Sequence, residues 1–279
     1  MIYNSIKHLG KWQQYFAFNV WDLDSAKAVI DAAIEKERPI FLQISSKVFN
    51  KINHEEFIYI MKNYILDNRA DAIIHLDHSR NIEQVHRAIE AGWDSVMYDG
   101  SHLALAENIA KTAKVVEIAK KRNVLVEGEI GQVLGVEDDI RVDKEVQITI
   151  EDIERFITLT DVDLLAVAIG TAHGQYGENK PNINYELLGQ IENLTKIPFV
   201  VHGGSELTDE TLKKLWTFEN VKKINISTDI KQAYRKGILD SMRQGLLEEK
   251  GFDALRVEKQ IYETIKSVAV SKLKVLEEI

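Results

Sequence analysis

The chain lacks cysteine altogether and contains only three prolines among its 279 residues. Without cysteine, disulfides and thiolate metal sites are excluded, so a transition-metal site here would have to use histidine and carboxylate side chains. Two of the prolines, Pro39 and Pro198, stand at the start of apolar runs, where a strand tolerates a missing amide donor. No linker rich in proline, glycine or serine divides the chain, and we therefore expect one domain over residues 1–279.

The sequence also lacks a surplus of positive charge and a long hydrophobic run. The formal net charge is −9, and acidic and basic residues are interspersed. This balance argues against nucleic acid or an anionic membrane as the main partner, although local donors can still bind a phosphorylated ligand. No apolar stretch reaches the length of a membrane span, and residues 1–5 lack the pattern of a signal peptide. We therefore expect a cytoplasmic protein.

Eight short apolar runs follow one another along the chain, and segments with the period of a helix lie between them. A parallel strand that is buried on both faces has the sequence of a continuous apolar run. Eight such strands alternating with helices predict the α/β class and a single (β/α)8 TIM barrel. A doubly wound open sheet is the alternative, but the chain has no GxGxxG turn. The runs cover residues 15–20, 39–45, 72–78, 95–100, 124–131, 164–170, 199–204 and 223–228.

Among the intervening segments, residues 24–36, 104–122 and 229–248 have helical periodicity, and 252–279 predicts an extra C-terminal helix. The polar stretch 132–149 follows the fifth run without such a period. A long loop at that end of a barrel is a candidate lid. It carries Glu137, a carboxylate that could remove a proton if the loop moves, although a loop charge is more commonly just solvated.

Histidines stand at three of the predicted strand ends, where barrels of this kind carry their chemistry. They are His78, His173 and His202. A lone histidine at such a position would more often pack or hydrogen-bond, but three at equivalent positions favour one divalent metal site with a position open for substrate. Zinc there would polarise a carbonyl and stabilise an enediolate, and cobalt or iron are alternatives.

Asp77 lies directly beside His78 in the third run. Successive strand residues face opposite sides, so both side chains can reach one site only where this alternation relaxes at the end of the strand. A carboxylate beside a metal could act as a general acid or base, and a structural hydrogen bond is the alternative role.

The seventh and eighth runs end in segments typical of a phosphate site. Residues 203–205 read Gly-Gly-Ser, and residues 225–228 read Asn-Ile-Ser-Thr. In this fold the loops after strands seven and eight commonly bind phosphate through backbone amides, and glycine lets the backbone approach closely. Two tight turns with a helix cap would explain either segment alone, but the pair favours a phosphate site.

Several segments of the chain together resemble one known family. The segments are AFN at 17–19, HLDH at 75–78, SVMYDGSH at 95–102, VEGEIG at 126–131, VED at 136–138, AVAIGTAHGQY at 166–176, VVHGGS at 200–205 and KINIST at 223–228. In this order they resemble the class II, metal-dependent ketose-bisphosphate aldolases, which include fructose- and tagatose-bisphosphate enzymes. The resemblance implies a lyase that reversibly cleaves a ketose (bis)phosphate to dihydroxyacetone phosphate and an aldehyde such as glyceraldehyde 3-phosphate.

The resemblance also implies roles for single residues. His78, His173 and His202 would hold one catalytic Zn²⁺, Asp77 would handle the proton on the aldehyde hydroxyl, and Glu137 would move the proton at the nucleophilic carbon. A monovalent cation, Na⁺ or K⁺, would accompany the phosphate, and the protein would form a homodimer or homotetramer. The metal-neighbouring residues would be Glu129 and Asp99, and the substrate- and phosphate-binding residues would be Asn19, Ser45, Gly174, Gly203, Gly204, Ser205, Asn225, Ser227 and Thr228.

The chain departs from the family pattern at several points. Leu134-Gly135 stands where the family usually has two glycines before its acidic pair. Glu206 is similar to the acid that tagatose-type members carry, whereas fructose-type members tend to have glycine. The Asp-Pro-Arg that often grips the far phosphate is missing, and Arg256 is the only candidate for that role.

Other functions stay open at the level of sequence. A Schiff-base aldolase needs a desolvated lysine at a strand end, but Lys223 opens its strand and Lys47 lies in a loop. Zinc hydrolases on this barrel often carry a His-x-His pair at strand one, where this chain has Asn19. A catalytically altered relative that regulates or supports another chain, or an aldolase for a different phosphorylated keto sugar, are the remaining alternatives.

Overall fold

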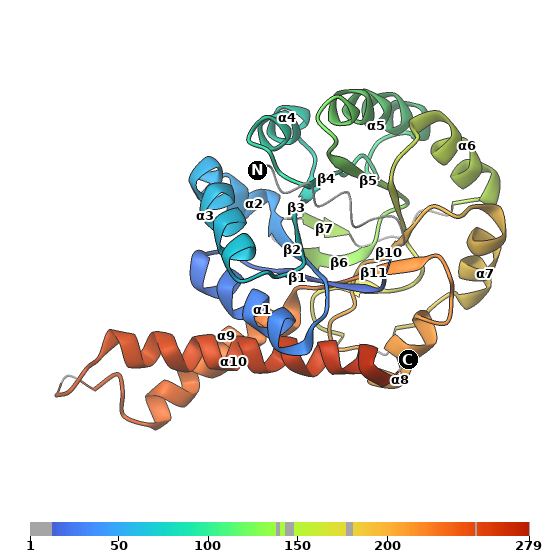
Figure 1. Cartoon of the computed structure of the whole chain (residues 1–279). Coiled ribbons are helices and arrows are strands. Elements are labelled where there is room, and N and C mark those ends of the chain that lie inside the picture. The colour runs from blue at the N-terminus through green and yellow to red at the C-terminus, as the bar shows by residue number, and fades with distance from the viewer. Residues whose placement is uncertain (1–12, 138–139, 143–147, 177–180, 249, 279) are drawn as a thin grey trace.

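Eight parallel strands close into a barrel with helices around it, as the run pattern predicts (Figure 1). The computed structural model describes residues 13–137, 140–142, 148–176, 181–248 and 250–278. The barrel strands follow the eight predicted runs in order, and their bounds are β1 (Tyr15–Asn19), β2 (Ile40–Ser45), β3 (Ala72–Ser79), β4 (Ser95–Tyr98), β5 (Leu125–Ile130), β8 (Leu164–Val167), β10 (Phe199–Val201) and β11 (Val221–Ile226).

Side chains cap the free amides at the start of most of the described helices. Asp22 and Thr149 form capping boxes at the starts of α1 and α6. The predicted helix at 229–248 ends at Arg243, because the chain turns at Gly245, whose φ is +71°. The helices are α1 (Leu23–Lys36), α2 (Ser46–Phe49), α3 (His54–Asp67), α4 (Ile82–Glu90), α5 (Leu105–Lys120), α6 (Ile150–Thr160), α7 (Tyr185–Leu194), α8 (Asp209–Leu215), α9 (Thr228–Arg243) and α10 (Ala254–Val275), which continues as the 3₁₀ turn η2 (Leu276–Glu278).

The barrel interior changes from apolar to polar along the strands. Side chains alternate along each strand, so every second residue points inward. On β5, Leu125 belongs to the apolar cluster inside the barrel, and the inward residues that follow are Glu127 and Glu129. On β3, Ile73 is followed in the same way by His75 and Asp77. The interior therefore becomes polar and charged toward the carboxyl ends of the strands.

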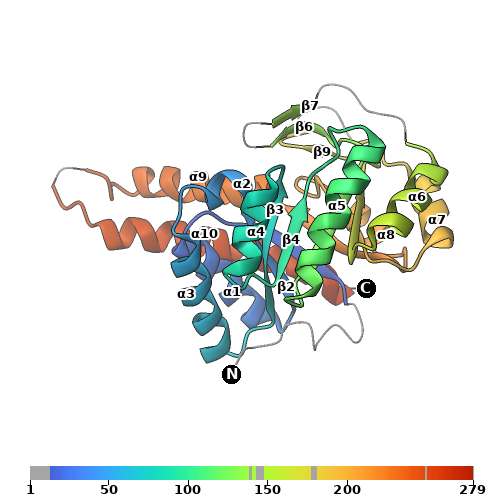
Figure 2. The ribbon, with the colours of Figure 1, turned by 90° about the horizontal axis from the view of Figure 1, so that it is seen from above.

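A second, three-stranded sheet lies across one end of the barrel (Figure 2). Its strands are β6 (Leu134–Glu137), β7 (Ile140–Val142) and β9 (Ala172–His173), in the order β7-β6-β9. The polar stretch 132–149, predicted as a loop, thus contains a β-hairpin, whose strand β6 pairs with the segment that carries His173. Gly135 faces His173 in this pairing, and a Cβ there would lie 2.1 Å from the His173 carbonyl oxygen. Only glycine fits this position.

Helices α9 and α10 pack against each other and project together away from the barrel (Figure 1). We call this helix pair the arm. Exposed apolar side chains lie near the link between the two helices, namely Met242, Leu247, Phe252 and Leu255. Among the described residues, no helix combines the length and the apolar character needed to cross a membrane.

The close contact inside the arm gives a test of the fold. A Cβ at Gly237 of α9 would lie 2.6 Å from the Ile261 Cα of α10, so Gly237→Ala must push the helices apart. We expect it to lower the free energy of unfolding by about 1–3 kcal/mol. Gly189→Ala in α7 is the matched control, because nothing lies within 4 Å of its added Cβ. Better helix propensity should raise the stability of this variant by about 0.5–1 kcal/mol. Urea unfolding followed by circular dichroism measures both, and equal effects would contradict the packing described here.

Candidate functional site

Three histidines from separate strand ends converge at the mouth of the barrel. His78 lies near the end of β3, His173 on β9, and His202 directly after β10. Their ring centroids are 4.6 to 5.7 Å apart. One ring nitrogen of each lies within 4.8 Å of the others, a grouping that could hold a metal ion. The structure therefore brings together the three residues that the sequence predicted as metal ligands.

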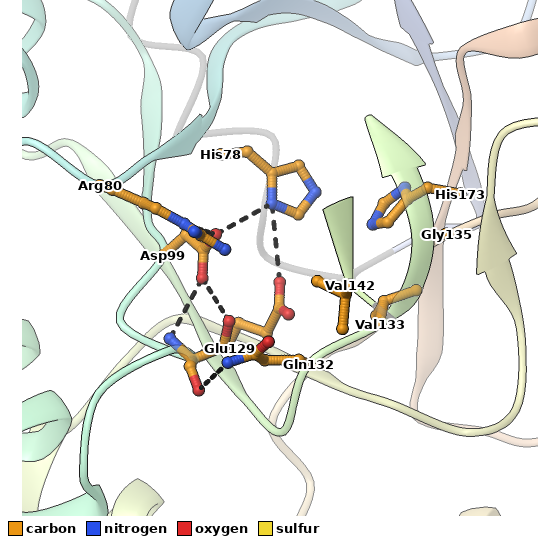
Figure 3. Close-up of a pocket in the computed structure, with 10 residues that line it drawn as sticks. His78, Arg80, Asp99, Glu129, Gln132, Val133, Gly135, Val142 and His173 are labelled. Carbon is orange, nitrogen blue, oxygen red and sulfur yellow. Dashed lines mark hydrogen bonds and ion pairs between the residues drawn. The ribbon is translucent and has the colours of Figure 1, made fainter. Parts of the chain in front are cut away.

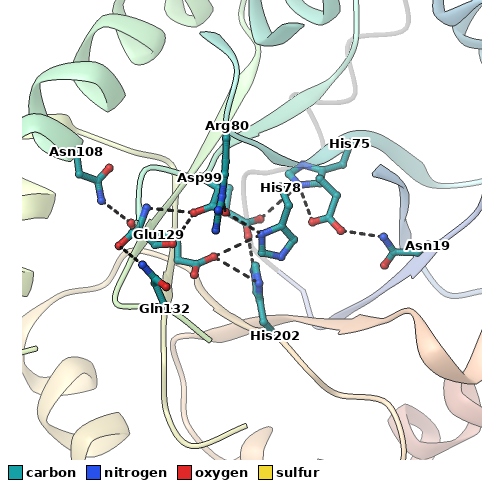
Figure 4. A network of polar contacts seen from close by, with 12 residues as sticks. Asn19, His75, His78, Arg80, Asp99, Asn108, Glu129, Gln132 and His202 are labelled. Atoms are coloured by element: carbon teal, nitrogen blue, oxygen red, sulfur yellow. Dashed lines mark hydrogen bonds and ion pairs between the residues drawn. The ribbon is translucent and has the colours of Figure 1, made fainter. Parts of the chain in front are cut away.

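The backbone at His78 explains how neighbouring residues of one strand reach the same site. His78 has a φ of +48°, in the left-handed region that residues other than glycine seldom adopt. The register between β3 and β4 shifts between Leu76 and Ser79. Asp77 can then approach Asn19 while His78 approaches the carboxylates of Asp99 and Glu129 (Figure 4). The alternation of side chains between the two faces thus breaks down at the end of β3, as expected if Asp77 and His78 share one site.

A buried carboxylate fixes the orientation of His202. Its Nε2 lies 2.8 Å from Oε1 of Glu127, and Lys223 donates to Oε2 of the same carboxylate at 2.7 Å. Burial by itself would raise the pKa of Glu127, but Lys223 and the His202 hydrogen bond lower it well below its usual range. Glu127 is thus ionised and accepts a hydrogen bond from Nε2–H, which leaves Nδ1 of His202 as the ring nitrogen with a lone pair.

The lone pair on Nδ1 of His202 indicates that this nitrogen binds a ligand. Nδ1 of His202 is buried and has no hydrogen-bond partner among the described residues. Burial and the proximity of His78 lower the pKa of His202, which favours the neutral imidazole that metals bind. A neutral histidine whose second nitrogen is held by a carboxylate is the usual arrangement around a bound metal. These residues therefore fit a divalent ion such as zinc.

Two further carboxylates line the site beside the histidines (Figure 3). Oε2 of Glu129 lies 3.7 Å from Nδ1 of His78 and 3.7 Å from Nδ1 of His202. Oδ2 of Asp99 lies 3.7 Å from Nδ1 of His78 and accepts a hydrogen bond from Nε of Arg80 at 2.9 Å. Burial and the nearby Asp99 raise the pKa of Glu129. Both predicted neighbours of the metal therefore contact the histidine cluster, and sequence reasoning missed Arg80.

Asp77 is oriented by the first strand. Its side chain is 1% exposed, and Oδ2 accepts a hydrogen bond from Nδ2 of Asn19 at 2.8 Å. The Asn19 amide is in turn held by Gln43 at 3.4 Å. Oδ1 of Asp77 has no hydrogen-bond partner within the described part of the chain, so it can take a proton from a ligand.

Ser45, a predicted substrate-binding residue, makes a local contact within its own segment. Its hydroxyl accepts from the Val48 amide and caps α2.

A second pocket adjoins the histidine cluster at the start of α9. Asn225 is 5% exposed, and neither polar atom of its side chain has a partner among the described residues. Ser227 precedes α9 without a side-chain cap, and the Ser205 hydroxyl accepts from the Ser227 and Asp229 amides. This start of a helix, with a hydroxyl on it, is suited to an anion. We call this the anion pocket, and it is lined by His173, Gly174, Gly203, Ser205, Asn225, Ser227, Thr228 and Lys231.

Most residues predicted to bind phosphate line the anion pocket, and Gly204 does not. A Cβ at Gly204 would lie 2.3 Å from Cγ2 of Ile224, so this glycine is needed for packing against β11. Lys231 was missing from the prediction, although it follows Thr228 by three residues and so shares its face of a helix that begins there. Helical spacing was the signal that could have identified it.

Three other residues singled out in the sequence have different positions. Arg256 is exposed in the first turn of α10 and does not line either pocket described here. Glu137 ends β6, and its side chain lies outside the part of the chain that the structure describes. Glu206 accepts a hydrogen bond from the Tyr176 amide at 2.9 Å, and the Tyr176 hydroxyl donates to the Gly203 carbonyl. Glu206 thus fastens the loop after β9 to the loop after β10.

Comparison with known proteins identifies the family and agrees with the fold. The family model described as fructose-bisphosphate aldolase class-II matches residues 12–279. The solved YdjI aldolase of Escherichia coli K12 is 27% identical, with a TM-score of 0.79 over 98% of this chain and 95% of that one. The fructose-bisphosphate aldolase of Campylobacter jejuni is 20% identical, with a TM-score of 0.81 over 99% and 93%. At this lower identity the likeness concerns the fold.

The role of Glu127 can be tested by metal binding. Glu127→Gln keeps the size of the side chain but removes the charge between Lys223 and His202, so the His202 ring loses its fixed orientation. We expect the affinity for Zn²⁺ to fall about 10- to 100-fold. Competition with a fluorescent chelator measures this affinity. Asp163→Asn is the control, because Asp163 accepts the Val126 amide at the opposite end of the barrel, and its Zn²⁺ affinity should be unchanged. A folded Glu127→Gln protein with full Zn²⁺ affinity would rule the role out.

Proposed function

Because the chain belongs to the class II fructose-bisphosphate aldolase family and is an aldolase, we propose that it cleaves a ketose phosphate with the help of one divalent ion. The products are dihydroxyacetone phosphate and an aldehyde, and the reaction is reversible. The observation that carries this proposal is that His173 belongs both to the histidine cluster and to the anion pocket. A phosphate in that pocket places the adjoining carbonyl group beside the three histidines.

We propose Zn²⁺ as the ion, held by His78, His173 and His202. Neutral imidazoles in a cysteine-free site suit zinc, and the carboxylate behind His202 supports this choice. When bound, the ion polarises the ketone and stabilises the negative charge of the enediolate. The anion pocket would bind the phosphate of the dihydroxyacetone unit through Ser205, Thr228 and Lys231 at the start of α9, beside a monovalent cation, Na⁺ or K⁺.

Two carboxylates would move the protons. In the cleavage direction, Oδ1 of Asp77 takes the proton from the hydroxyl on C4 while the C3–C4 bond breaks. The electron pair of that bond stays on C3, and the C4 carbon becomes the aldehyde. Glu137, at the end of β6, then delivers a proton to C3 and completes dihydroxyacetone phosphate. Asn19 holds Asp77 in place, and Asn225 offers its unpartnered amide to the dihydroxyacetone hydroxyl.

A Schiff-base mechanism receives no support from the lysines. Lys223 is completely buried and donates to Oε2 of Glu127, and it lines neither of the two pockets at the barrel mouth. For the sugar, Glu206 supports a tagatose-type substrate, with fructose 1,6-bisphosphate or another phosphorylated keto sugar as alternatives.

We also propose a homodimer or homotetramer that acts in cytoplasmic carbohydrate metabolism such as glycolysis. The exposed apolar side chains near the link of the arm support an oligomer, because a partner chain could cover them.

The first experiment measures the cleavage of tagatose 1,6-bisphosphate and fructose 1,6-bisphosphate, with and without a chelator. We expect release of dihydroxyacetone phosphate that the chelator abolishes and added Zn²⁺ restores. His173→Ala should lose both bound metal and activity, since it removes one of three ligands. His86→Ala is the control, because His86 lies on α4 and lines neither pocket at the barrel mouth. Activity that survives chelator and His173→Ala would overturn the mechanism, and bound metal without cleavage of any ketose phosphate would favour a regulatory subunit.

Asp77 offers a separate test of proton transfer. Asp77→Asn keeps the shape of the side chain but can no longer accept the hydroxyl proton. We expect kcat for cleavage to fall about 10²- to 10⁴-fold while metal content is retained. Stopped-assay kinetics and metal analysis of the same preparation measure the two quantities. Equal loss of metal and activity would instead make Asp77 a structural support for His78.

A further inference from the structure

The barrel mouth contains a cationic group, Arg80, that none of the roles above uses. Arg80 directly follows β3 and lies two residues after His78. It lines the pocket that also contains His78, Asp99, Glu129 and His173 (Figure 3). This pocket and the anion pocket both include His173, so they adjoin the histidine cluster from two directions.

Asp99 fixes Arg80 but uses only part of its guanidinium group. Nε donates to Oδ2 of Asp99 at 2.9 Å, and the side chain is still 32% exposed. Within the described part of the chain, the two terminal nitrogens of Arg80 make no hydrogen bond. Four of the five N–H donors are therefore available to a ligand in the pocket. Asp99 also accepts from the Ser101 hydroxyl and amide, so it is a rigid support for Arg80.

The surroundings favour a cation beside an anionic ligand. Asp77 and Asp99 are buried at this end of the barrel, and negatively charged carboxylates near the pocket repel a negatively charged substrate. A planar guanidinium with two free terminal nitrogens is suited to phosphate or carboxylate, which it can bind in a bidentate manner. Lys231 and the start of α9 supply the corresponding donors on the other side of His173.

We propose that Arg80 binds an anionic group, a phosphate or a carboxylate, on the aldehyde half of the substrate. This inference rests on the proposed aldolase reaction and makes the substrate charged at both ends. The dihydroxyacetone phosphate half occupies the anion pocket, the reacting carbons lie beside the histidines, and the far anion contacts Arg80. Arg80 is then a specificity-determining residue for the aldehyde.

The test measures condensation of dihydroxyacetone phosphate with three aldehydes that differ in charge. Glyceraldehyde 3-phosphate carries a phosphate, succinic semialdehyde a carboxylate, and glyceraldehyde no charge. For the natural chain we expect a higher kcat/KM with at least one charged aldehyde than with glyceraldehyde. Arg80→Gln should lower kcat/KM for that charged aldehyde about 10- to 100-fold and change the value for glyceraldehyde less than about twofold. Arg80→Lys should recover part of the loss, because it restores the charge without the bidentate geometry.

Arg256→Gln is the matched control, since it removes an exposed arginine that lies in neither pocket. The preferred charged aldehyde distinguishes phosphate from carboxylate recognition. A loss of equal size for all three aldehydes in Arg80→Gln would overturn the proposal and make Arg80 a support for Asp99. A selective loss in Arg256→Gln alone would overturn it in favour of that arginine. If the natural chain consumes no dihydroxyacetone phosphate with any aldehyde and cleaves no ketose phosphate, the aldolase proposal itself fails, and this inference fails with it.

Discussion

The buried contact among Lys223, Glu127 and His202 determines how the polar end of this barrel is organised. An ammonium and a carboxylate inside a protein lose much hydration, so such a pair contributes little net stability and is costly to break by removing one partner. Here the pair has a geometric consequence. The carboxylate has one oxygen for Lys223 and one for His202, which leaves the imidazole a single orientation and a single tautomer. The lone pair of Nδ1 then faces the other two histidines.

The parallel barrel makes this arrangement possible because its strands stack inward side chains in layers. An apolar layer with Phe41 and Leu125 lies at one end, and a polar layer with His75 and Glu127 lies above it. His75 contacts the Ser95 hydroxyl at 2.8 Å and lies 3.6 Å from Glu127, so the polar layer is tied across several strands. The histidine cluster therefore stands on a layer of side chains that is hydrogen-bonded across the barrel.

The sequence predicts the elements that depend on local pattern and misses those that depend on pairing at a distance. Each buried parallel strand is a continuous apolar run, which is why all eight barrel strands could be located. Strands β6 and β9 escaped prediction, because β9 has only two residues and the two strands pair across a long separation in the sequence. Among site residues, the three histidines were found from their positions at strand ends. Lys231 could have been found from its helical spacing to Thr228, whereas Arg80 lies just beyond a strand end, where only the folded structure shows which pocket its side chain lines.

The pairing of β6 with β9 also limits how substrate can enter. Lids on many barrels open as whole loops and leave the catalytic groups in place. In this chain the backbone that covers the mouth is paired, at Gly135, with the backbone of His173. Lifting β6 from its base would pull on one of the three histidines and so weaken the hold on any ion between them. Substrate and product would therefore enter and leave by movements that keep Gly135 of β6 paired with His173.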